Sequence, residues 1–140
     1  IACVKRQRVA LAHQQGVDLG ARMHAALATT LAARPGHGCL LIGTDCPALS
    51  SIHLQRAAAA LAVHDAVLVP AHDGGYVLIG LKTPQPALFD GIDWGTPAVL
   101  AATRARLAQV GLRCAEFGPL PDLDTADDYR AARAAGWIAA

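Results

Sequence analysis

Continuous apolar runs alternate with segments of helical spacing along the chain, and this pattern predicts a mixture of strands and helices. The runs 39–43 and 66–70 are apolar throughout, as is typical of strands buried on both faces of a sheet. The segment 52–61 between them repeats apolar residues at the three- and four-residue spacing of a helix. Strand, helix and strand at these distances predict a βαβ unit.

The same patterns predict further elements on both sides of this unit. The spacing of Leu19, Met23, Leu27 and Leu31 predicts a helix that Asp18 caps. The other expected elements are strands at 8–12, 76–81 and 112–117, a helix capped by Thr96 that ends before Gly111, and a helix capped by Thr125. We therefore expect one α/β domain over 1–140, with three layers: a mostly parallel, mixed sheet and helices on both faces.

Composition narrows the classes of function. The chain has 140 residues, and 12 Lys and Arg stand against 11 Asp and Glu, so the basic surface of a nucleic-acid-binding protein is not expected. No apolar run approaches the roughly 18–20 residues that span a bilayer, so we expect no membrane partner. None of the four cysteines forms a Cys-x-x-Cys pair, which favours reduced thiols in a cytoplasmic protein.

Candidate chemistry gathers in three polar loops, 44–47, 72–76 and 122–125, which adjoin predicted strands. In open α/β sheets, ligands bind outside the carboxyl ends of the strands. Asp45 follows a buried strand directly, so it is either a ligand for a hard cation such as Mg²⁺ or Mn²⁺ or a turn residue that bonds its own backbone. Both interpretations agree with the spacing.

The other loop residues have paired interpretations as well. Asp73 is either a base for an attacking hydroxyl or part of a tight Asp-Gly turn. Asp124 is either a second carboxylate for the same cation or a charge that stabilises a helix dipole. Trp94 is either a residue that stacks on a sugar or base or an anchor of the core. Arg22 either reaches a phosphate from its helix or lies at the surface.

Taken in order, these segments resemble one known family. The segments are Gly16–Met23, Leu41–Leu49, His72–Leu81, Trp94–Pro97 and Asp122–Thr125, and the resemblance runs from about Gln14 to about Arg133. They resemble the DUF2064 group of bacterial GT-A-type glycosyltransferases, which are related to the cofactor guanylyl- and cytidylyltransferases.

This resemblance implies a nucleotide-diphospho-sugar transferase fold and a metal-dependent transferase. It implies a nucleoside-diphosphate-activated sugar as donor and a small molecule as acceptor, with nucleotidyl transfer from an NTP as the alternative reaction. The implied ligands of Mg²⁺ or Mn²⁺ are Asp45 and Asp124, and the implied base is Asp73. The residues implied to border the substrate are Thr44, Gly74, Gly75, Tyr76 and Trp94.

One element of the resembled family has no counterpart in this sequence. Its members begin with a first strand and a loop bearing Gly, Lys and Arg that grips the nucleotide. We therefore expect the chain to be the C-terminal two-thirds of a GT-A-like domain that lacks its first strands, with a non-catalytic binding module as an alternative. A sheet without those strands would expose an edge, which favours a homodimer through edge pairing.

Overall fold

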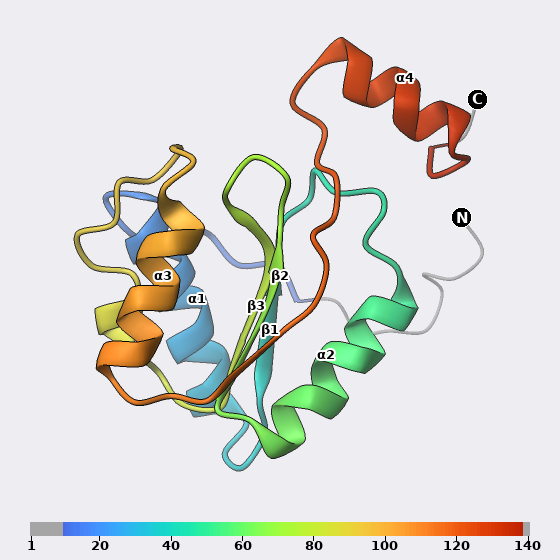
Figure 1. The fold of residues 1–140 in the computed structure, drawn as a ribbon. Coiled ribbons are helices and arrows are strands. Elements are labelled where there is room, and N and C mark those ends of the chain that lie inside the picture. The colour runs from blue at the N-terminus through green and yellow to red at the C-terminus, as the bar shows by residue number, and fades with distance from the viewer. Residues whose placement is uncertain (1–9, 139–140) are drawn as a thin grey trace.

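The computed structural model describes residues 10–138 and contains a four-stranded sheet with helices on both faces (Figure 1). The helices are α1 (Leu19–Ala33), α2 (Ser51–Val63), α3 (Val99–Gln109) and α4 (Ala126–Ala134), with a 3₁₀ turn η1 (Pro86–Leu88). The strands are β1 (Cys39–Ile42), β2 (Ala66–Pro70), β3 (Tyr76–Leu81) and β4 (Cys114–Glu116).

The sheet is mixed, with strand order β1-β3-β2-β4. β3 runs antiparallel to both of its neighbours, and β2 pairs with β4 in parallel. β1, β2 and β4 therefore run in one direction and β3 runs against them. This confirms the predicted α/β fold class with a mixed sheet and helices on both faces. The expectation of a mostly parallel sheet holds for strand direction but not for pairing, because β3 separates the two strands of the predicted βαβ unit and both of its pairings are antiparallel.

Two apolar clusters, one on each face of the sheet, form the core. α1 and α3 cover one face, where Leu27 and Leu107 pack with Ala66 and Leu68 of β2. α2 covers the other face, where Leu61 packs with Val67 and Val69 of the same strand. Successive residues of a strand point to opposite faces, so the uninterrupted apolar run of β2 serves both clusters.

Three expectations differ from the structure at their boundaries. Residues 10–12 are exposed and form no strand, and residues 8 and 9 of that prediction lie outside the described part of the chain. The strand expected at 112–117 is shorter, at Cys114–Glu116. α3 begins at Val99 with Ala98 as its N-cap, because the Thr96 side chain instead donates a hydrogen bond to the carbonyl of Asp93.

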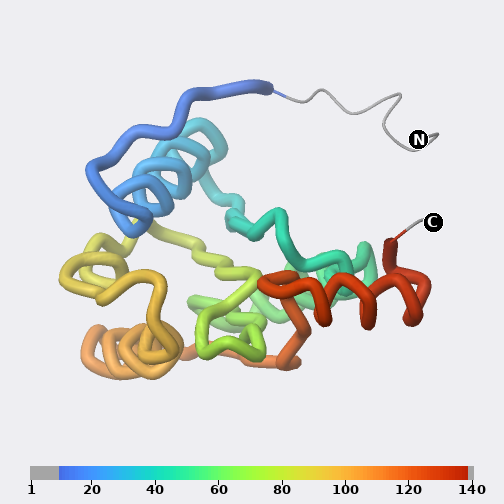
Figure 2. Tube along the Cα trace, turned by 90° about the horizontal axis from the view of Figure 1, so that it is seen from above, coloured from blue at the N-terminus to red at the C-terminus, as the bar shows by residue number. Residues whose placement is uncertain are grey.

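α4 is the last helix of the described residues, and it lies apart from the α1 and α3 layer. Figure 2, seen from above, shows α4 on the same side of the sheet as α2. Thr125 caps this helix and accepts a hydrogen bond from the Asp128 backbone N–H, as its sequence predicts. Within residues 10–138, no helix is long and apolar enough to cross a membrane.

Candidate functional site

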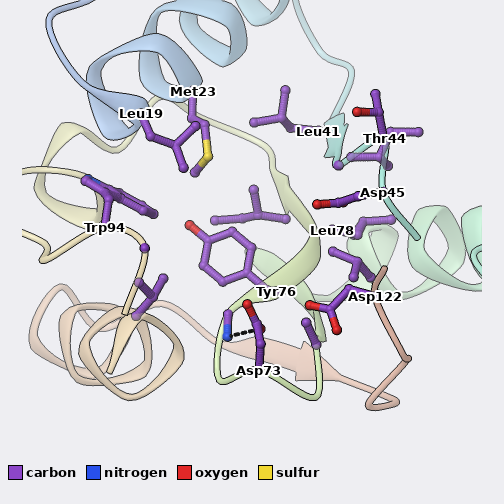
Figure 3. Close-up of a pocket in the computed structure, with 18 of the residues that line it drawn as sticks. Leu19, Met23, Leu41, Thr44, Asp45, Asp73, Tyr76, Leu78, Trp94 and Asp122 are labelled. Atoms are coloured by element: carbon purple, nitrogen blue, oxygen red, sulfur yellow. Dashed lines mark hydrogen bonds between the residues drawn. The ribbon is translucent and has the colours of Figure 1, made fainter. Parts of the chain in front are cut away.

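A cavity of about 640 Å³ opens at the edge of the sheet where the three co-directional strands end. The loop after β1 brings Thr44 and Asp45 to it, the loop after β2 brings Asp73, and the segment after β4 brings Asp122 and Asp124. Figure 3 shows Thr44, Asp45, Asp73 and Asp122 on one side of the cavity, and Leu19 and Met23 of α1 on the other. This is the position at which α/β sheets bind ligands.

The carboxylates of Asp73, Asp122 and Asp124 form the acidic part of the wall. One oxygen of each lies within 4.8 Å of the others. Burial raises the pKa of Asp122, and the neighbouring carboxylates of Asp73 and Asp124 raise it further. A bound cation would relieve this repulsion.

Asp45 lines the same cavity but stands outside this group of three. Its carboxylate folds back over Gly43, where a Cβ would lie 2.9 Å from Asp45 Oδ1. Its backbone carbonyl accepts a hydrogen bond from the Leu123 N–H at 3.0 Å. The structure thus joins the Asp45 loop to the loop that carries Asp124, the predicted partner of Asp45. The Asp124 carboxylate itself groups with those of Asp122 and Asp73.

The turn between β2 and β3 fixes Asp73. Asp73 Oδ1 accepts a hydrogen bond from the Gly75 N–H at 2.7 Å, so the turn role considered for this residue is present. Gly74 has φ +92° and lies against Pro97, whereas Gly75 lies on the cavity wall. The Gly74 carbonyl accepts a hydrogen bond from the Leu100 N–H, which holds the turn against the start of α3.

Tyr76 and Trp94 form part of the apolar wall. Burial raises the pKa of Tyr76, and the nearby Thr103 hydroxyl opposes this only in part. The Trp94 ring stacks on Phe89 with ring centres 6.4 Å apart. It also packs against Gly20, where a Cβ would lie 2.5 Å from Trp94 Nε1. Trp94 therefore anchors the core and lines the cavity at once.

Sequence reasoning did not select Asp122 or the apolar residues Leu19, Met23 and Leu41, all of which line the cavity. The signal for Asp122 was its spacing from Asp124, because residues two apart in an extended segment share one face. Arg22, from α1, is the single Lys or Arg among the described residues that line the cavity.

The donor set suits a small hard cation. Carboxylate oxygens are the ligands that Mg²⁺ and Mn²⁺ prefer, and the three acidic side chains on this wall offer such oxygens within 4.8 Å of one another. Asp73 and Asp124 are exposed and Asp122 is half-buried, so a cation can reach them from the cavity. The acidic wall therefore fits the predicted Mg²⁺ or Mn²⁺.

Comparisons with known proteins place this fold. The chain is similar to the crystal structure of a "putative nucleotide-diphospho-sugar transferase" from Desulfovibrio desulfuricans G20, with 34% identity and a TM-score of 0.79. The similarity covers 86% of this chain and 54% of the other, so this chain spans about half of that protein's length. The fold is accordingly that of the nucleotide-diphospho-sugar transferases.

The family follows from the sequence match. Residues 2–96 match the family described as "Uncharacterized protein conserved in bacteria (DUF2064)", and the chain belongs to this family. The predicted resemblance is thereby confirmed. No curated protein matches the chain.

Proposed function

We propose that the cavity is the metal- and acceptor-binding part of a transferase site that uses a nucleoside-diphosphate-activated sugar. The observation that carries this proposal is the trio of Asp73, Asp122 and Asp124 beside an apolar cavity at the carboxyl edge of the sheet. The similarity to a protein named as a nucleotide-diphospho-sugar transferase supports the same class. The chain would then be the C-terminal two-thirds of a GT-A-like domain.

Asp122 and Asp124 would hold Mg²⁺ or Mn²⁺, with Asp45 on the adjoining wall. Such an ion supplies neutralisation of the charge that develops on the diphosphate leaving group. Asp122 is suited to this role because burial, and then the neighbouring carboxylates, raise its pKa and make its charged form less favourable without a cation.

Asp73 would orient the acceptor hydroxyl and take its proton. The hydrogen bond from the Gly75 N–H holds one carboxylate oxygen in place, which fixes the direction of the side chain. Tyr76 and Trp94 would pack against the substrate, with Thr44 and Gly75 at its edges, and Arg22 would meet an anionic group.

A nucleotidyltransferase of the cofactor guanylyl or cytidylyl type is the alternative reaction, since the same carboxylates can serve an attacked phosphate. A non-catalytic binding module is a further alternative, because the chain spans only about half of its structural neighbour.

We also propose a cytoplasmic location for the protein. Among the described residues, Cys39, Cys46 and Cys114 are free thiols, which supports this proposal.

A donor panel separates these functions. The chain is incubated with Mn²⁺ and each of several nucleotide sugars and NTPs, and the released nucleotide and pyrophosphate are measured. Release of a nucleoside diphosphate indicates glycosyl transfer or donor hydrolysis, and release of pyrophosphate indicates nucleotidyl transfer. Release of neither product contradicts the transferase proposal and favours the binding module.

Asp124→Asn tests the residue assignment in the same assay. We expect turnover to fall at least about tenfold. Even residues that only orient a metal ligand commonly cost this much activity when they are replaced, and Asp124 is a proposed ligand itself. Asp127→Asn is the matched control, since Asp127 is exposed on the first turn of α4 and pairs with Arg130. Equal activity of the two variants would show that Asp124 has no part in the site.

A further inference from the structure

The two loops that frame the acidic wall are far apart in sequence and are joined directly in the structure. Cys46 and Pro121 are 75 positions apart, and the Cys46 thiol donates a hydrogen bond to the Pro121 carbonyl with Sγ and O 3.2 Å apart. Beside it, the Leu123 N–H donates to the Asp45 carbonyl at 3.0 Å. We call this pair of hydrogen bonds the interloop clamp.

The clamp joins the chain segments that carry Asp45 and Asp122. Pro121 and Leu123, which take part in it, flank Asp122 in the chain. Asp45 contributes its carbonyl, and the next residue, Cys46, contributes its thiol. A shift of either hydrogen bond therefore moves Asp122 relative to Asp45.

Cys46 is held firmly enough to transmit position. The residue is 7% exposed and packs in the apolar cluster on the α2 face of the sheet, together with Val69 and Val77. Its neighbours Thr44 and Asp45 are exposed and line the cavity. The thiol thus connects the buried core to the exposed loop that lines the cavity.

We infer that Cys46 is a positioning residue for the cation site, acting through the Pro121 carbonyl on Asp122. This inference rests on the proposed function. Partners that orient metal ligands without touching the metal commonly change its affinity when they are removed, because ligand placement within a fraction of an ångström decides the coordination. A single S–H···O contact is weak, so the effect comes from the clamp and the packing of the thiol together.

Two substitutions separate positioning from simple packing. Cys46→Ser keeps the size and the hydrogen-bond donor, and Cys46→Ala removes the donor. Val67→Ala is the control, because Val67 is fully buried in the same cluster and does not line the cavity. It removes core volume without touching the clamp.

The test is a Mn²⁺ titration of the full chain, together with hydrogen exchange at the Leu123 amide. For Cys46→Ala we expect Mn²⁺ affinity to fall about tenfold and the Leu123 amide to exchange faster. Cys46→Ser and Val67→Ala should both bind Mn²⁺ with the wild-type affinity. In both variants the Leu123 amide should exchange no faster than in wild type, once any general change in the exchange of core amides is subtracted. Unfolding in denaturant reports the global stability of each variant separately.

The outcomes distinguish this inference from the function on which it rests. Unchanged Mn²⁺ affinity in Cys46→Ala, or an equal loss in Val67→Ala, would overturn the positioning role while the proposed function stands. Failure of the wild-type chain to bind Mn²⁺ would overturn the proposed cation site and the positioning role with it. The Leu123 exchange does not depend on Mn²⁺, so it still reports whether the thiol maintains the clamp.

Discussion

Two aspartates, Asp65 and Asp122, lie in opposite electrostatic surroundings. The backbone N–H and then the guanidinium of Arg113 lower the pKa of Asp65. Burial and then the carboxylates of Asp73 and Asp124 raise the pKa of Asp122. The folded chain therefore favours the charged form of Asp65, as expected for a structural contact. It disfavours the charged form of Asp122, as expected for a binding site.

The Asp65 contact gives a pH dependence with a definite sign. A carboxyl group whose folded pKa is lowered stabilises the fold above its unfolded pKa, and this contribution disappears as pH falls through the folded pKa. Wild type should be more stable than Asp65→Asn near pH 7, and the difference should close between about pH 5 and pH 2. Urea unfolding across this range measures it.

Asp90→Asn serves as the control for this prediction. Asp90 is exposed, and its carboxylate forms no salt bridge with the part of the chain that the structure describes. This variant therefore removes a carboxylate without removing a contact to Arg113, and its unfolding is measured over the same range. A gap for Asp65→Asn that stays constant down to low pH would contradict the role given to Arg113.

For single residues, the sequence predicted which side chains line the cavity, but it did not predict which of them lie close to one another. Asp45, Asp73 and Asp124 were selected because they lie in polar loops next to strands, and all three line the cavity. The closeness of Asp122 to Asp73 was not predictable, since it depends on the path of the chain after β4. The buried face of Trp94 against Gly20 likewise depends on how α1 packs.

Among the elements, the β2–β3 turn shows how a loop can be fixed by a neighbouring helix. The Gly74 carbonyl accepts from the Leu100 N–H at 2.9 Å, and a Cβ on Gly74 would lie 2.4 Å from the Pro97 carbonyl oxygen. The turn therefore lies directly on the backbone that leads into α3. This contact places Asp73 and Gly75 at the cavity.

Gly74→Ala should be strongly destabilising. The residue has φ +92° and an added methyl group would collide with backbone, so we expect a loss of roughly 3 kcal/mol. Gly36→Ala is the control, because Gly36 also has positive φ but nothing lies within 4 Å of its Cβ position. It should lose only about 1–2 kcal/mol. Denaturant unfolding measures both, and equal losses would refute the collision with Pro97.

Apolar periodicity predicted the elements but not their pairing. The runs that form β1, β2 and β3 were identified with nearly the observed bounds, because buried strands are apolar throughout. The insertion of β3 between β1 and β2 was not expected, since an apolar run does not specify its partners. The start of α3 was misplaced because Thr96 uses its hydroxyl within the preceding turn.

For the whole molecule, the outer edge of β1 is the feature with the clearest consequence. β1 is at the end of the sheet and pairs only with β3 within the described residues. Unpaired N–H and C=O groups on an edge favour pairing with another strand. We therefore retain the prediction that the isolated 140-residue chain forms a homodimer through this edge.

Light scattering with chromatography tests the dimer over a dilution series. A mass of twice the single chain at high concentration, falling toward one chain on dilution, is the expected result. Hydrogen exchange should then show the β1 amides better protected at high concentration. A monomer at every concentration would show that the edge of β1 does not pair with a second copy.

The central claim is that the acidic wall binds a divalent cation, and Mn²⁺ binding followed by electron paramagnetic resonance tests it most directly. The signal of free Mn²⁺ should fall saturably on titration with wild type and with Asp127→Asn. Binding by Asp124→Asn should be at least about tenfold weaker. Equal binding by all three proteins, or none by wild type, would contradict the claim that this wall is a cation site.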